Sequence, residues 1–238
     1  MDLKELDVLS NKNIGEHWYY WAKARAVLKI IDKQQVTTIL DIGAGSGFFS
    51  EFLLENSSAQ EAWCVDINYE KEYDDYVNNK PIHFRKSVDS VNADIVLLMD
   101  VLEHVEDDVA LLKEYIPKVP QNSHFLISVP AFKFLWSSHD VFLGHYRRYT
   151  LKTCAESINK SGLYLQKSCY FYGLVFPLAA ILRLLQKIKT FTPKENKSQL
   201  TKHSAISNML FKFICKIEHS FMLYNKLAGI TAFCLAKK

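Results

Sequence analysis

Short hydrophobic runs alternate with helical patterns along the first two thirds of the chain. Runs of β-branched and aliphatic residues that are bounded by polar residues, Gly or Pro predict buried strands. The predicted strands cover 36–42, 62–66, 82–86, 93–99, 124–129, 164–172 and 230–236. Apolar residues recur at helical spacing over 16–31, 107–116 and 205–224. A further helix is predicted through Ser161, because Thr150 is a typical N-cap and Gly162 a typical stop.

This order of elements predicts an α/β, Rossmann-like, doubly wound sheet. Its strands are mostly parallel, and ligands of such sheets bind at the carboxyl ends of the strands. The 238 residues suffice for one domain, 1–238, that carries an insertion over 173–229 between the last two strands.

A glycine-rich turn follows the first predicted strand, in the sequence TILDIGAGSGFFS (38–50). Alternate glycines let backbone N–H groups approach a ligand, and a helix that begins at Phe48 points its positive end at the same place. The spacing G-x-G-x-G differs from the dinucleotide fingerprint, and no P-loop lysine follows. Asp41 would repel a pyrophosphate and could bind a cationic amine. A plain strand-to-helix turn with a capping aspartate is the alternative interpretation.

Two more motifs follow in order. Asp66 ends the second strand, 23 residues after Gly43, where a carboxylate commonly accepts the hydroxyls of a ribose. The sequence MDVLEHVEDD (99–108) follows the fourth strand. With these three motifs the chain resembles the class I S-adenosylmethionine-dependent methyltransferases, in particular the small-molecule branch that includes enzymes of quinone biosynthesis. The resemblance covers roughly residues 16–150.

The resemblance implies a seven-stranded sheet of order 3-2-1-4-5-7-6, with strand seven antiparallel. It also implies S-adenosyl-L-methionine as the cofactor, with S-adenosyl-L-homocysteine as its product. The glycines would surround the methionine half with Asp41 near its amine, Asp66 would bind the ribose, and Ile67 and Asp89 would contact the adenine. The cofactor-binding residues implied in this way are Asp41, Gly43, Ala44, Gly45, Gly47, Asp66, Ile67, Asp89, Met99, Asp100 and Val101.

Candidate catalytic groups lie after the fourth and fifth strands. A base is needed if the acceptor is a hydroxyl, and His104, His139 and His145 are the candidates. The residues Asp140, Arg147, Arg148 and Tyr149 are candidates for substrate binding, because guanidinium groups match phosphate oxygens. A surface loop whose arginines pair with acids is the alternative. The five cysteines are scattered, so the sequence predicts no metal site and a reducing compartment.

The C-terminal part of the chain, which includes most of the insertion, is basic. Residues 183–238 hold 11 Lys and Arg against 2 Asp and Glu, whereas residues 1–182 hold 18 against 24. The uncharged run over 168–182 is too short to span a bilayer. Apolar helices flanked by lysines (Lys187, Lys189, Lys194, Lys197, Lys202) fit an anionic membrane surface. A helical hairpin packed on the domain, or on a second copy in a homodimer, is the equal alternative.

We therefore expect a methyltransferase that O-methylates an anionic, lipid-associated small molecule or glycan intermediate. A soluble acceptor such as a quinone precursor, and a catalytically silent cofactor-binding subunit, are the alternatives. We expect a cytoplasmic protein without a secretory signal, peripheral on the inner face of the membrane. Nucleic acid is not an expected partner, because no basic and aromatic stacking surface is apparent.

Overall fold

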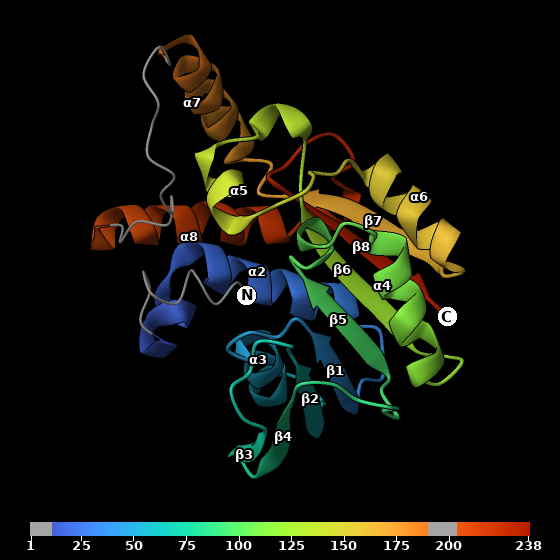
Figure 1. Ribbon diagram of the computed structural model, residues 1–238. Helices are drawn as coiled ribbons and strands as arrows, with labels where there is room; N and C mark the ends of the chain where they lie inside the picture. The colour runs from blue at the N-terminus through green and yellow to red at the C-terminus, as the bar shows by residue number, and fades with distance from the viewer. Residues whose placement is uncertain (1–10, 190–203) are drawn as a thin grey trace.

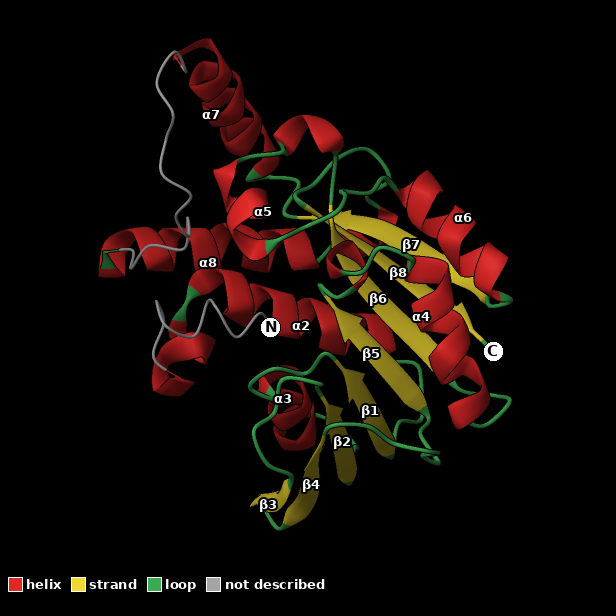
Figure 2. Ribbon diagram, in the orientation of Figure 1, coloured by secondary structure: helices red, strands yellow, loops and turns green. Residues whose placement is uncertain are grey.

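The computed structural model describes residues 11–189 and 204–238 and contains a mixed sheet with helices on both faces (Figures 1 and 2). The strand order is β3-β4-β2-β1-β5-β6-β8-β7. The strands are β1 (Thr38–Ile42), β2 (Glu61–Val65), β3 (Tyr73–Val77), β4 (Lys80–Arg85), β5 (Ile95–Met99), β6 (His124–Pro130), β7 (Tyr164–Phe171) and β8 (Thr231–Lys237). The helices are α2 (Trp18–Ile31), α3 (Phe48–Asn56), α4 (Asp108–Tyr115), α5 (Ser138–Leu143), α6 (Leu151–Ser161), α7 (Phe176–Lys189) and α8 (Ala205–His219).

The predicted order of seven strands is confirmed, with β8 antiparallel to both of its neighbours. The structure adds β3, an edge strand that pairs antiparallel with β4. Its residues are largely exposed, so it lacks the hydrophobic pattern from which strands are predicted. The sequence signal for this strand is the pair Asn78-Asn79. Both residues have positive φ, which is the conformation of a two-residue hairpin turn.

Each face of the sheet has its own hydrophobic core. Helices α2, α3 and α8 contribute buried residues to one core, and α4 and α6 to the other. Strand β5 is buried throughout because both cores cover it. The parallel strands end at one edge of the sheet, where the glycine turn and the segment after β5 meet.

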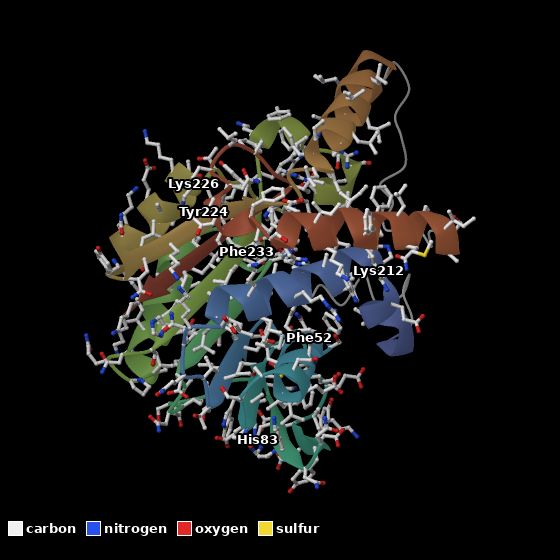
Figure 3. The ribbon with its side chains drawn as sticks, turned by 180° about the vertical axis from the view of Figure 1, so that it is seen from behind. Phe52, His83, Lys212, Tyr224, Lys226 and Phe233 are labelled. Atoms are coloured by element: carbon white, nitrogen blue, oxygen red, sulfur yellow. The ribbon has the colours of Figure 1, made fainter. Side chains whose placement is uncertain are left out.

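The insertion divides into two helices with different surroundings. Helix α8 lies along α2, so the predicted packing on the domain describes this part of the insertion (Figure 1). The Phe211 ring stacks on the Trp18 ring, with ring centres 4.8 Å apart. The Asn208 side-chain oxygen accepts a hydrogen bond from the backbone N–H of Trp18 at 2.8 Å. Lys212, labelled in Figure 3, lies with its ammonium 5.6 Å from the centre of the Trp21 ring.

Helix α7 instead projects from the body of the molecule (Figures 1 and 3). Five large apolar side chains of α7 are about half exposed, and five of α8 are between 46% and 77% exposed. These residues are Leu178, Ile181, Leu182, Leu184 and Leu185 of α7 and Ile206, Met209, Leu210, Phe213 and Ile217 of α8. Within the described ranges, every helix is too short or too polar to cross a bilayer. The predicted lysines at 194, 197 and 202 lie outside the described residues.

Candidate active site

The glycine turn joins β1 to α3 in a conformation that suits glycine. Gly43, Gly45 and Gly47 all have positive φ, between 54° and 78°. A Cβ on Gly43 would lie 2.8 Å from the Val101 side chain, so the segment after β5 closes directly over this residue. The Gly45 N–H donates to Asp66 Oδ2 at 3.0 Å, which ties the turn to the end of β2.

A cavity of about 630 Å³ opens beside this turn. Its lining includes Gly43, Asp66, Ile67, Asp100 and Val101, all of them predicted cofactor residues. Ile67 is 83% exposed and presents an apolar side chain at the cavity wall. Each Asp66 oxygen accepts from neighbouring groups, yet a carboxylate has about four acceptor positions, so capacity for a hydroxyl remains.

The other predicted cofactor residues are not among those that line the cavity. Ala44, Gly45, Gly47 and Met99 are buried. Asp89 is exposed and is not among the lining residues, so its contact with adenine stays a prediction.

Asp41 is buried in β1 and accepts from Ser50 Oγ at 2.9 Å. Burial raises the pKa of this carboxyl to about 6, and the nearby Asp66 charge contributes to the increase. The protein therefore maintains a poorly solvated acid beneath the glycine turn, which a cationic ligand group would stabilise.

A second, smaller cavity of about 170 Å³ adjoins the first. The two share Asp100, His104 and Leu143. All three predicted catalytic histidines line the smaller cavity, as do Tyr19 and Tyr20 of α2. A group transferred between ligands in the two cavities would pass Asp100 and His104.

Asp100 is held at this junction by a buried ion pair with Lys23 of α2. Its φ of 56° is rare for a residue other than glycine. Its N–H donates to the Ser128 carbonyl at 3.0 Å, and Ser128 Oγ donates to its carboxylate at 3.1 Å. Burial alone would lower the pKa of Lys23, but the charge and hydrogen bond of Asp100, with the nearby Tyr19 and Glu103, together raise it above its usual value.

Asp140 is fully buried and does not line the cavity. Its carboxylate contacts Arg148 Nε at 2.6 Å, Arg148 Nη2 at 3.0 Å and His145 Nδ1 at 3.0 Å. It also accepts from the N–H and hydroxyl of Ser137. Burial would raise the pKa of Asp140, but these donors hold it far below its usual range. Asp140 therefore orients His145 and Arg148, both of which do line the cavity.

Arg147 and Tyr149 are not brought to either cavity. Arg147 donates to the Glu106 carbonyl and lies 3.6 Å from the Asp108 carboxylate. The Tyr149 hydroxyl donates to Asp108 Oδ2 at 2.8 Å. For these two residues the structure matches the alternative in which the polar segment pairs with nearby acids.

Sequence patterns did not identify Lys23, Glu103 or Arg183 as site residues. Lys23 occupies an apolar face of α2, and a lysine within such a face was the available signal. Glu103 lies in the motif 99–108, from which the sequence predicted Met99, Asp100 and Val101 for the cofactor and His104 for catalysis. Arg183 comes from α7 of the insertion and reaches the smaller cavity only through the tertiary fold.

The fold, the glycine turn and the adjoining cavities define a class I methyltransferase. A family model described as a methyltransferase domain matches residues 14–168, which is more than half of the chain. The chain therefore belongs to this family, and the predicted class of S-adenosylmethionine-dependent methyltransferase is confirmed. No curated protein matches the chain.

Several solved structures share the fold. A methyltransferase in complex with the Haloferax volcanii Trm112 activator has a TM-score of 0.58 and 15% identity, over 99% of this chain and 96% of that chain. Haemonchus contortus phosphoethanolamine N-methyltransferase 2, with phosphomonomethylethanolamine and S-adenosylhomocysteine, has a TM-score of 0.55 and 15% identity, over 100% of this chain and 60% of that chain. An Archaeoglobus fulgidus S-adenosylmethionine-dependent methyltransferase has a TM-score of 0.53 and 17% identity, over 99% of this chain and 98% of that chain. At such identities the likeness concerns the fold alone.

The Lys23–Asp100 pair makes an asymmetric prediction for stability. Asp100→Asn leaves a fully buried lysine without its counter-charge and should cost about 3–5 kcal/mol. Lys23→Met should cost less, because the Asp100 side chain is 27% exposed and keeps some solvation. The double variant should be more stable than Asp100→Asn.

Urea unfolding measures the free energy of unfolding of all three variants. Lys29→Met on the same helix is the control, and its stability is expected within about 0.5 kcal/mol of the parent. Equal losses for both single variants would contradict the asymmetry, and a double variant no more stable than Asp100→Asn would contradict the pairing.

Proposed function

We propose that the chain transfers a methyl group from S-adenosylmethionine to a hydroxyl oxygen of an anionic, lipid-associated small molecule or glycan intermediate. The observation that carries the proposal is the pair of adjoining cavities, with Arg148 and Arg183 on the wall of the smaller one. The larger cavity is assigned to the cofactor and the smaller to the acceptor.

The described residues fit the cofactor. Gly43 allows close approach at the turn, Asp66 offers a ribose acceptor, and the exposed Ile67 offers an apolar surface for adenine. Asp41 is buried and lines neither cavity, so any effect of its charge on the methionine amine would act through the glycine turn rather than by direct contact. The cofactor supplies a methyl group on a positively charged sulfur, so the protein has to align the acceptor and exclude water.

The acceptor cavity favours an anion that carries a hydroxyl. Arg148 is pre-oriented by Asp140, and its Nη1 donates to the Ala131 carbonyl at 3.1 Å, so its guanidinium is fixed. Arg183 adds a second positive charge. Burial lowers the pKa of Arg183 and the neighbouring Arg148 lowers it further, with Asp140 acting in the opposite direction, so a bound anion would stabilise the Arg183 charge. His104, His139 and His145 offer nitrogens that can accept or transfer the hydroxyl proton.

The insertion supports a lipid-associated acceptor. Arg183 lines the acceptor cavity from α7, while Leu178, Leu182 and Leu185 of the same helix are about half exposed. Residues 183–238 are strongly basic, so the apolar surface of α7 and α8 is complementary to anionic lipid. One helix therefore joins the acceptor site to a surface suited to a membrane.

Two alternatives have weaker support. A quinone precursor would use the aromatic wall of Tyr19 and Tyr20, but it gives no role to Arg183. A silent subunit would need no acceptor cavity, yet one adjoins the cofactor cavity. The amine substrate of the H. contortus enzyme is a property of that protein.

Arg183→Gln should lower acceptor methylation. The assay follows transfer of a labelled methyl group from S-adenosylmethionine into a lipid extract and into an aqueous extract of the source cell. We expect an anionic, lipid-soluble product that carries an O-methyl group. Loss of the second cation should raise KM for this acceptor about tenfold or more, since a charge-assisted hydrogen bond contributes about 1.5–3 kcal/mol.

Arg147→Gln is the matched control, because Arg147 lies outside both cavities and should leave KM nearly unchanged. Label only in water-soluble or amine products would contradict the proposed acceptor. An effect of Arg147→Gln equal to that of Arg183→Gln would contradict its placement.

Binding to anionic vesicles tests the lipid surface. The variant Leu178→Ser/Leu182→Ser/Leu185→Ser should bind phosphatidylglycerol vesicles several-fold more weakly than the parent in a sedimentation assay, with unchanged S-adenosylmethionine affinity. Deleting the whole insertion is unsuitable, because α8 packs on α2. Equal binding to neutral and anionic vesicles, or a dimer that the substitutions dissolve, would contradict the membrane role.

A further inference from the structure

Glu103 is a buried carboxylate that lacks a hydrogen-bond partner for both oxygens among the described residues. It is 1% exposed and lines the smaller cavity. The neighbouring acids are compensated, since Lys23 pairs with Asp100 and Arg148 with Asp140. A buried carboxylate without a hydrogen-bond partner is costly, so a cation at this position would stabilise it.

Two histidines surround this carboxylate. One ligand atom each of Glu103, His104 and His145 can be chosen so that all three lie within 4.8 Å of one another. The imidazole rings meet edge to face, with centroids 4.6 Å apart. Nitrogen and oxygen ligands of a tetrahedral zinc ion lie about 3.4 Å apart, so the side chains would have to close by about 1–1.5 Å to complete the arrangement.

Asp140 prepares His145 for a ligand. It occupies Nδ1 of the imidazole at 3.0 Å, so Nε2 is the nitrogen that can bind a metal ion. A carboxylate on the far nitrogen of a ligand histidine fixes the ring and raises its basicity. Asp140 is itself fixed by Arg148 and Ser137, which makes this support rigid.

We propose that Glu103, His104 and His145 bind a divalent first-row transition-metal ion at the junction of the two cavities. Two imidazoles and one carboxylate favour Zn²⁺ or Mn²⁺ over Mg²⁺. The positive charge of Arg148 is balanced by Asp140, and the metal ion supplies the charge that Glu103 lacks. Three protein ligands leave positions open toward the acceptor cavity.

The role of this site rests on the proposed function. With His104 and His145 as ligands, His139 on the same cavity wall is the histidine left to take the hydroxyl proton, and a bound cation would lower the hydroxyl pKa. The acceptor oxygen would then form the C–O bond as the methyl C–S bond breaks, and the electrons of that bond would remain on sulfur as a neutral thioether.

Calorimetry tests the site without knowledge of the acceptor. The untagged, full-length protein is dialysed against EDTA, returned to chelator-free buffer and titrated with ZnCl2, MnCl2 and MgCl2. We expect a single site per chain for Zn²⁺ or Mn²⁺, and weaker binding of Mg²⁺. Glu103→Gln should reduce the affinity at least tenfold, and His145→Gln should do the same.

His139→Gln is the matched control, because His139 lines the same cavity outside the three ligands and should retain metal affinity. Unchanged affinity for S-adenosylmethionine verifies that each variant is folded. Failure of the parent to bind any of the three ions would overturn the proposal, as would parent-like affinity in Glu103→Gln. Metal binding without methylation of an anionic acceptor would refute the proposed function and leave the site standing.

Discussion

The buried ion pair between Lys23 and Asp100 is the contact on which the site depends. Lys23 has no exposed surface, so α2 can cover this face of the sheet only with a counter-charge at the end of β5. The pair fixes Asp100 in a left-handed conformation between the two cavities. Because α8 packs on α2, the position of the insertion depends on the same contact.

Charge compensation organises the acceptor side in the same way. Asp140 is buried and pairs with Arg148 and His145. The guanidinium and the imidazole therefore line the cavity, while the carboxylate stays buried. Glu103 breaks the pattern, since its buried oxygens have no described hydrogen-bond partner. The exception lies beside His104, where the two cavities meet, and it is the basis for the proposed metal site.

The features that could be predicted from sequence are those encoded locally. The β1 run, the three glycines and the acid after β2 follow one another along the chain, so these elements could be predicted locally, whereas the strand order came from the family resemblance. Strand β3 could not be predicted, because an exposed edge strand needs no apolar pattern. In the segment after β6 the sequence showed which polar residues are present, but not which of their side chains face the cavity. His145 and Arg148 face the cavity, whereas Arg147 and Tyr149 turn toward Asp108.

The structure of the complex with S-adenosylhomocysteine tests the central claim most directly. The two-cavity account predicts the ribose at Asp66, the adenine against Ile67 and the sulfur at the junction formed by Asp100 and His104, facing the smaller cavity. A ligand whose sulfur points away from that junction, or one bound outside the larger cavity, would contradict the account.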